Sequence, residues 1–410
     1  MAATEMTAYD PWDPAVLEDP YPAYDWLRAN HPIYHVAEHD IWVISRHEDV
    51  MAAVRDTAVF SSNQGNSYER RPVPMLVGLD PPAHTRLRRL VSRHWTPRMI
   101  AALEPRIDRL VDEIVDAAVV QAADGGAGDF VVDVCELLPV TLIAEIMGIP
   151  TEDWEQFRRW SDATVAQMAG PPTEANELLI VEFAMYFFDL VTRRQATFDE
   201  GTADIDDPND MLGILFGTTS DGDRLEIDEI VAMCVLLVVA GNETTTNLMA
   251  NLGLEVLIGR PDVWQRCIDD VGLVGALIEE GLRFTSPVQG LFRNTLSEVT
   301  IGGTTIPADA KVFLCYASAN RDTDKWPDAE QFELDRYPDP LINTDHLAFA
   351  SGIHHCLGAH LARLEARKMF ERLARSGVTL SQTSPVVWGA NPSIRGMRSL
   401  PVRVSTGATS

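Results

Sequence analysis

The sequence predicts a mainly α-helical protein that carries small β-sheets toward both ends of the chain. Across residues 98–260, apolar side chains recur at three- and four-residue spacing, as they do in amphipathic helices. Outside this region, short segments alternate apolar and polar residues around polar or glycine-containing turns, a pattern typical of β-hairpins. A chain of 410 residues, 46% of them hydrophobic, is long enough to bury a large core. No internal repeat or domain linker is recognisable, so we expect one domain over residues 1–410.

The expected elements follow one another along the chain. A proline-punctuated start leads into a short helix, and residues 32–46 alternate around a polar turn as a hairpin does. Two prolines at 81–82 open a helix that continues through the arginine-rich stretch behind them. In the helical region, breaks are expected at 124–130 and 202–210. Short strands are expected around the Gly302–Gly303 turn, then a helix from Cys356 to about Arg375, and a strand-like tail over 379–405.

Charge and cysteine usage restrict the function classes. The net charge of −28 disfavours nucleic acid and anionic membranes as partners, unless basic residues cluster locally. Five widely spaced cysteines, an odd number without C-x-x-C, indicate neither a disulfide framework nor a zinc ribbon, and this suits a reducing compartment. The amino terminus has no signal pattern, and the longest apolar run, Ile230 to Gly241, is too short for a membrane span. We therefore expect a soluble, cytoplasmic protein.

The stretch FASGIHHCLGAH, residues 349–360, combines three histidines with one cysteine. A zinc site needs about four converging ligands, but only Cys356 and His360, at i and i+4, share a helix face. Alternatively Cys356 acts alone, just before a helix N-terminus whose N–H groups favour a thiolate. Gly352 and Gly358 would let a flat macrocycle approach the backbone, and a single thiolate on haem iron favours O–O cleavage. From this segment alone, zinc, haem and an inert buried cysteine all stay open.

The helical stretch VLLVVAGNETTTNLM, residues 235–249, places polar groups where an apolar helix should have none. Unpaired polar groups are costly to bury. Leu236, Ala240 and Thr244 share one face at i, i+4 and i+8. The small Ala240 and Gly241 leave room for a ligand, and Glu243 stands beside the Thr244 hydroxyl, as a proton-delivery site requires. A helix that turns polar as it leaves the core is the alternative interpretation.

Two further motifs are weaker when taken singly. Glu280 and Arg283 stand at i and i+3 on a helix and can pair, although E-x-x-R occurs by chance in many helices. His84 and Arg88, at i and i+4, share a face that can hold an internal anion. A solvated basic helix is the alternative for this second pair.

In this order and spacing, the motifs resemble those of the cytochrome P-450 family of haem-thiolate monooxygenases, in particular its soluble bacterial members. The resemblance covers essentially the whole chain. The family's cysteine motif F-G-x-G-x-H/R-x-C-x-G is matched from Phe349 to Gly358, with Ala350 in place of the usual glycine. Its oxygen-binding helix motif A/G-G-x-D/E-T is matched from Ala240 to Thr244, and its E-x-x-R pair by Glu280 and Arg283.

The resemblance implies the cytochrome P-450 fold, with haem b (iron protoporphyrin IX) between the long central helix and the cysteine-loop helix. Cys356 would be the axial thiolate ligand and so the metal-binding residue, while Thr244 and Glu243 would relay protons. The other cofactor-binding residues it implies are His84, Arg88, Arg293 and His354 at the propionates, with Ala240, Gly241, Phe349 and Gly358 along the macrocycle. Glu280, Arg283 and Arg336 would form a structural ion-pair network.

The implied reaction inserts one oxygen atom from O2 into a small hydrophobic or aromatic substrate, by hydroxylation or O-dealkylation. The expected substrate contacts are Met75, Leu76, Val77, Leu236, Ala240, Thr244, Val288, Leu291 and Ile394, with residues 162–168 and 182–188 as a lid. Electrons would come from NAD(P)H through a ferredoxin reductase and a ferredoxin, which would dock on a basic patch of Arg86, Arg89, Arg93, Arg363, Arg367 and Lys368.

Three alternatives stay open at this point. A haem protein that only binds a gas or carries electrons would not need the Glu243–Thr244 pair. A zinc-binding helical protein would use the cysteine differently. A haem-thiolate enzyme that catalyses oxidative coupling, or another non-hydroxylating oxidation, would keep every motif named above.

Overall fold

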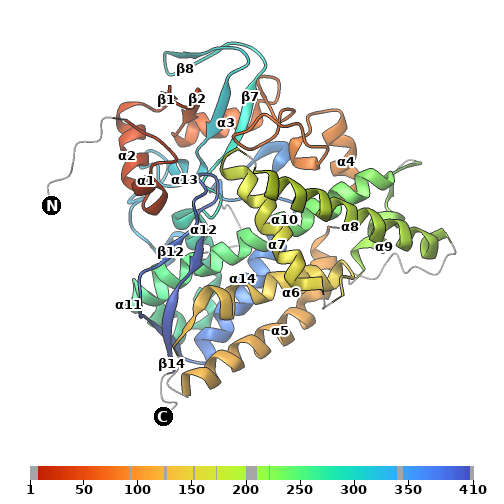
Figure 1. The fold of residues 1–410 in the computed structure, drawn as a ribbon. Coiled ribbons are helices and arrows are strands. Elements are labelled where there is room, and N and C mark those ends of the chain that lie inside the picture. Colours follow the sequence, from red (N-terminus) through yellow and green to blue (C-terminus); the bar gives the residue numbers. More distant parts are fainter. Residues whose placement is uncertain are drawn as a thin grey trace.

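The computed structural model describes residues 8–92, 95–123, 127–150, 153–171, 173–199, 210–220, 222–338 and 345–406. Its larger part is a bundle of helices around α10 (Ile227–Leu252), which runs through the middle of the molecule (Figure 1). Helix α10 packs on α6 (Leu137–Ile146), α8 (Glu174–Asp199), α12 (Val274–Thr285) and α14 (Ala359–Arg375). Because α10 has neighbours on several sides, it carries apolar residues around most of its circumference.

The start of α10 is set by local sequence. The Glu226 and Glu229 side chains each accept from the other residue's backbone N–H, which completes a capping box. Helix α10 then continues without interruption through Thr244, and a π-helical segment, Gly253–Ile258, follows it. The remaining helices are α1 (Pro14–Glu18), α2 (Tyr21–Asn30), α3 (His47–Arg55), α4 (Ala83–Ser92), α5 (Pro97–Ala123), α7 (Trp154–Ala169), α9 (Met211–Gly217), α11 (Pro261–Asp269) and α13 (Tyr316–Ala319).

The largest sheet joins segments from both halves of the chain in the order β1-β2-β10-β7-β3. It is drawn on the side of the molecule where α1 to α3 lie (Figure 1). The predicted hairpin is confirmed: β1 (Ile33–Val36) pairs antiparallel with β2 (Ile41–Ile44). Strand β2 then pairs in parallel with β10 (Lys311–Leu314), which pairs antiparallel with β7 (Leu291–Thr295), and β7 pairs with β3 (Phe60–Ser61).

Smaller sheets form at the strand-like segments that were expected, and short strands also occur within residues 98–260, where helices were expected. The Gly302–Gly303 turn connects β8 (Val299–Ile301) and β9 (Thr304–Ile306). In the tail, β11 (Val378–Gln382) and β14 (Pro401–Thr406) pair with each other and with β4 (Ala127–Asp129), while β12 (Val387–Trp388) pairs with β13 (Met397–Ser399). The strands β5 (Thr219–Ser220) and β6 (Asp223–Arg224) form a short hairpin before α10.

Two expectations need comment. The cysteine helix begins at Ala359 rather than at Cys356, because residues 352–354 form a tight 3-10 turn and Cys356 still belongs to the loop. The expected breaks at 124–130 and 202–210 lie partly or mostly outside the described residues. In the described part of the chain, no helix is both long enough and apolar enough to cross a bilayer.

Candidate active site

The cysteine loop is a strained turn that aims one side chain. Ala350 has φ +54° and Gly352 has φ +68°, both in the left-handed region that L-residues avoid. The backbone N–H of Cys356 donates to the carbonyl of Phe349 at 3.0 Å, which closes the loop. The family motif has glycine where this chain has Ala350, and the positive φ supplies the physical reason for that glycine.

Cys356 has a different environment from the other cysteines. Its side chain is accessible, whereas those of Cys135, Cys234, Cys267 and Cys315 are buried. Protein nevertheless surrounds the sulfur on its other sides, and this desolvation raises its pKa. The N–H groups of Gly358 and Ala359 and the charges of Arg88 and Arg363 act in the opposite direction. A bound metal cation would outweigh the desolvation and hold the thiolate.

The zinc interpretation finds no support around Cys356. Among the described residues, the possible metal-ligand atoms that lie close together as a group of three belong to Asp10, Glu38 and His39. These residues are far from the cysteine loop in sequence. His355 and His360 are exposed beside Cys356 without joining such a group.

Four basic side chains gather near Cys356, those of His84, Arg88, Arg293 and His354. Within the part of the chain that the structure describes, none of them is ion-paired. The rings of His84 and His354 lie 4.5 Å apart, and His354 Nε2 contacts Ser62 Oγ at 3.1 Å. Burial, followed by the charges of Arg293, His84 and Arg88, lowers the pKa of His354 to about 3. Burial also lowers the pKa of Arg88.

Buried polar atoms without partners show what this cluster is built to bind. Both ring nitrogens of His84 and Nη2 of Arg293 are buried and make no hydrogen bond. Such groups are costly unless a ligand satisfies them. A ligand that carries carboxylates would supply acceptors for Arg293 Nη2 and for the ring N–H of His84, and the two haem propionates fit these donors. The residues present therefore fit haem with its iron at Cys356.

The α10 residues form an accessible face inside the bundle. Ala240 is exposed and Thr244 half-buried, although the helix lies at the centre of the fold. Thr244 Oγ1 donates to the Ala240 carbonyl at 2.7 Å, the back-bond that threonine makes in helices. A methyl group added at Gly241 would meet no atom within 4 Å. A ligand can therefore approach the helix at this point.

Glu243 has the properties of a proton donor. Its Oε2 is buried without a hydrogen bond. Burial raises the pKa of Glu243 to about 7; Arg398 opposes this, and Asp162 and Glu136 add to it. A carboxyl group that titrates near neutral pH is suited to general acid–base work. These three charged residues come from other segments of the chain, so the sequence motif did not reveal their effect on Glu243.

The expected substrate contacts are only partly brought together. Met75, Leu76 and Leu236 belong to one hydrophobic cluster, together with Phe349. Val288 and Leu291 pack instead at the edge of the sheet-side cluster, and Val288 forms a backbone bridge with Ile394. Val77 is half-buried on the 3-10 turn Leu76–Gly78. In the expected lid, Phe183 and Phe187 of α8 pack on Phe157 of α7, whereas Met185 and Phe188 are exposed.

The structure brings Glu280, Arg283 and Arg336 together in a buried network. Arg283 is fully buried and uses all five of its N–H donors. Two go to the Glu280 carboxylate, at 2.7 and 2.8 Å, and three to the carbonyls of Asn320, Ala329 and Gln331. Arg336 Nε lies 3.2 Å from Glu280 Oε2. The network ties α12 to the irregular segment ahead of the cysteine loop.

The structure corrects the expectation of a basic patch, because the described cations have acidic partners. Arg86 pairs with Glu229 and Asp223, and Arg89 lies 3.8 Å from Asp223. On α14, Arg363 pairs with Glu279, Arg367 with Glu371, and Lys368 with Glu104 and Asp108. Arg93 lies outside the described residues. Carboxylates close to each described cation reduce the positive potential that the sequence suggested.

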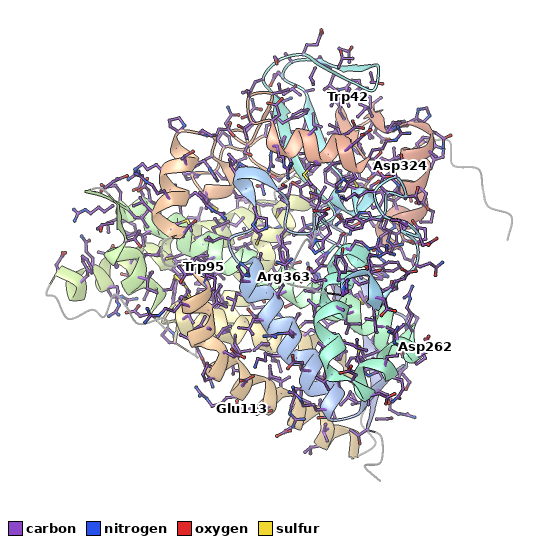
Figure 2. The ribbon with its side chains drawn as sticks, turned by 180° about the vertical axis from the view of Figure 1, so that it is seen from behind. Trp42, Trp95, Glu113, Asp262, Asp324 and Arg363 are labelled. Carbon is purple, nitrogen blue, oxygen red and sulfur yellow. The ribbon has the colours of Figure 1, made fainter. Side chains whose placement is uncertain are left out.

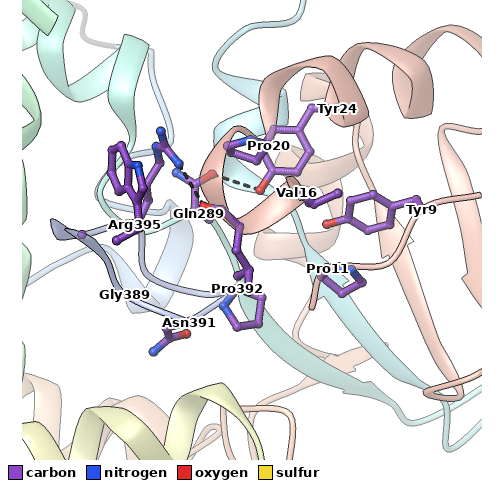
Figure 3. Close-up of a pocket in the computed structure, with 13 residues that line it drawn as sticks. Tyr9, Pro11, Val16, Pro20, Tyr24, Gln289, Gly389, Asn391, Pro392 and Arg395 are labelled. Atoms are coloured by element: carbon purple, nitrogen blue, oxygen red, sulfur yellow. Dashed lines mark hydrogen bonds between the residues drawn. The ribbon is translucent and has the colours of Figure 1, made fainter. Parts of the chain in front are cut away.

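A separate small pocket lies between the start of the chain and its tail (Figure 3). It is lined by the N-terminal segment and by the tail, and the Tyr24 hydroxyl donates across it to Gln289 Oε1 at 3.0 Å. None of the expected site residues lines it.

Comparison with known proteins places the chain among relatives of similar length. The cytochrome P450 family model matches residues 179–376. Cytochrome P450 130 of Mycobacterium tuberculosis is 38% identical, covering 95% of this chain and 96% of its own. The vitamin D(3) 25-hydroxylase of Pseudonocardia autotrophica is 34% identical, with 98% of both chains covered. The crystal structure of CYP109E1 from Bacillus megaterium in complex with testosterone superposes with a TM-score of 0.79, at 30% identity, covering 94% of this chain and 99% of that one.

Proposed function

Because the chain belongs to the cytochrome P450 family and is therefore a haem-dependent monooxygenase with a cysteine thiolate as axial ligand, we propose that Cys356 is that ligand and that one oxygen atom of O2 is inserted into a hydrophobic or aromatic organic substrate. The observation that carries the proposal is the accessible face of α10, where an open small-residue surface ends at Thr244 beside the buried acid Glu243.

The chain's own residues divide the work of this site. When bound, haem supplies the iron at which O2 binds and is activated. His84, Arg88, Arg293 and His354 hold the carboxylates of the cofactor. Thr244 presents its hydroxyl toward the accessible side of α10, and Glu243, with a pKa of about 7, is about half protonated at neutral pH and passes a proton toward it. Apolar residues along the early loop and α10 orient the substrate and limit water.

The substrate we propose is a compact apolar skeleton, and its conversion is hydroxylation, with O-dealkylation as a second outcome of the same oxygen insertion. Leu76 is buried in the same hydrophobic cluster as α10, and Met75 and Leu236 are partly buried against that cluster. Two relatives support a skeleton of fused or extended rings: one is named for hydroxylating vitamin D(3), and another was crystallised with testosterone.

We propose a ferredoxin as electron donor, with its reductase and NAD(P)H behind it, and a cytoplasmic location. Exposed bases still surround the cysteine loop, although the larger patch is paired. Arg55, which donates to Ser351 Oγ at 3.2 Å, is exposed, and His360 is exposed on the first turn of the helix after Cys356. An acidic carrier would meet these groups on the shortest path to the sulfur.

The test begins with the absorption spectrum of the purified protein, reduced and exposed to carbon monoxide. A strongly red-shifted Soret band is expected for the wild type and should be lost in Cys356→His. Testosterone and a panel of small aromatics are then titrated for a spin-state shift. Binders are incubated with a ferredoxin, its reductase and NADPH, and the products are identified. Substrate-independent NADPH consumption without oxygenated product would contradict the proposal, and dimeric products would support oxidative coupling instead.

Thr244 has a matched control in the same chain. Thr192 on α8 also donates to the carbonyl four residues before it, at 2.7 Å, but it is exposed and belongs to none of the motifs. Thr244→Ala should lower the yield of product per NADPH severalfold, whereas Thr192→Ala should leave it unchanged. Equal effects of the two changes would mean that Thr244 acts only on the helix.

A further inference from the structure

A buried three-residue network lies directly behind the cysteine loop. Glu279, on α12, accepts from Arg363 Nε at 2.5 Å and from Arg363 Nη2 at 3.0 Å, and it contacts His346 Nε2 at 2.9 Å. The Glu279 and His346 side chains are 3% and 1% exposed, and that of Arg363 is 21% exposed. Glu279 is not part of the E-x-x-R motif, although it stands next to Glu280 in sequence.

The hydrogen bonds define the role of each member. The N–H of Ala348 donates to His346 Nδ1 at 3.3 Å, so Nε2 carries the proton and donates to Glu279. Desolvation would raise the pKa of Glu279, but the His346 and Arg363 hydrogen bonds prevail and lower it, so the carboxylate is charged. Two hydrogen bonds to one charged carboxylate fix the orientation of the arginine guanidinium.

Arg363 points from this anchor to the cysteine loop. Its guanidinium lies over the Phe349 ring, 4.5 Å from the centroid. The Phe349 carbonyl in turn accepts from the Cys356 N–H at 3.0 Å. The charge of Arg363 also acts on the Cys356 sulfur, in the direction that favours thiolate. Figure 2 labels Arg363 on α14, on the face of the molecule opposite to the view of Figure 1.

We propose that Arg363, aimed by Glu279 and His346, is a positioning residue for the axial cysteine rather than part of a docking patch. It has two effects. Stacking on Phe349 holds the loop in which Cys356 is presented, and the fixed positive charge withdraws electron density from the sulfur and so raises the reduction potential of the iron bound to it. The inference rests on membership of the family and on nothing about the substrate.

Three substitutions separate these effects. Arg363→Gln removes the charge and weakens the stacking, and Arg363→Lys keeps the charge but loses the planar fork. Glu279→Gln keeps the arginine but removes its charged anchor. The matched control is Arg367→Gln, one turn further along α14, where an exposed arginine lies 3.9 Å from Glu371. All four changes are made in the full-length protein.

Two measurements that do not depend on turnover decide the matter. The first is the reduction potential of the haem-loaded protein. We expect a lower potential in Arg363→Gln, a small change in Arg363→Lys and none in Arg367→Gln. The second is hydrogen exchange at the Cys356 amide. It should become up to about tenfold faster in Arg363→Gln, as the loss of the cation–π contact predicts, and it should also become faster in Glu279→Gln, where the arginine loses its anchor.

Equal potentials in Arg363→Gln and Arg367→Gln would overturn the electrostatic part, because both lose one positive charge from the same helix. Unchanged amide exchange in Glu279→Gln would overturn the anchoring part. If Arg363→Gln fails to fold, Arg363→Lys and Glu279→Gln still test the anchor. If the wild type itself lacks the red-shifted carbonyl spectrum, the proposed ligand Cys356 is refuted. This outcome is distinguishable from a failure of the inference about Arg363.

Discussion

Replacing Lys311 by methionine should stabilise the protein, and more so at low pH. Lys311 lies in the middle of the five-stranded sheet and is 3% exposed. Its Nζ has Asn294 Oδ1 at 3.2 Å and the Phe292 ring centroid at 5.7 Å, and across the described residues it has no ion-pair partner. Burial, reinforced by Arg70 and Arg293, lowers the pKa from 10.5 to about 7.

The direction of the pH dependence follows from proton binding. The unfolded chain keeps the proton on Lys311 up to about pH 10.5, whereas the folded protein releases it near pH 7. Between these values the unfolded state binds more protons, so Lys311 makes the free energy of unfolding rise with pH. One pH unit of difference corresponds to about 1.4 kcal/mol. The penalty of the buried charge therefore reaches roughly 5 kcal/mol below pH 7.

Lys311→Met removes this penalty and gives up the hydrogen bond to Asn294, worth about 1 kcal/mol. Because the amine is neutral in the folded state at high pH, the variant's advantage should shrink as pH rises. Urea unfolding of wild type and variant at about pH 6 and about pH 9.5 measures it as a difference in unfolding free energy. Lys325→Met is the control, since Lys325 is partly exposed and pairs with Asp345. A pH-independent difference, or a less stable Lys311→Met at about pH 6, would refute the reasoning.

Three further predictions follow from the site. Ala350→Gly should raise the unfolding free energy by up to about 1 kcal/mol, because glycine relieves the left-handed strain at φ +54°; a lower melting temperature would contradict this. Arg283→Lys should lower it by about 3 kcal/mol, since a lysine cannot satisfy the Glu280 carboxylate and three carbonyls together; a loss below about 1 kcal/mol, read from urea midpoints, would count against the buried network. In the wild type, product formed per NADPH should fall as pH rises through about 7, where Glu243 loses its proton, whereas Glu243→Gln should show a low yield without that step. An unchanged step in this variant would assign the titration to another group.

The motifs of the proposed site were readable in the sequence because they are local. The Cys356 loop and the Ala240–Thr244 stretch each lie within one or two turns of chain, where spacing alone decides which side chains share a face. The Glu280–Arg283 pair is local for the same reason. The helical pattern between residues 98 and 260 was equally clear, since each amphipathic helix records its own buried side.

Other features depended on contacts between distant segments. Strand β2 pairs with β10, some 270 residues further along the chain, and neither strand's alternation names its neighbour. The same limit applies to Arg363. From the sequence it is one more cation on a basic helix, but in the fold it reaches the buried Glu279 of another helix and the Phe349 ring.

By itself, then, the sequence determined the cysteine loop, the Glu243–Thr244 stretch, the Glu280–Arg283 pair and the helical class, because each depends on spacing along a single element. Only the tertiary structure decided which charges are paired, which polar atoms are left without partners and how far burial moves a pKa. These depend on the distances between elements and on the water excluded between them, and Coulomb interactions and desolvation change steeply with both.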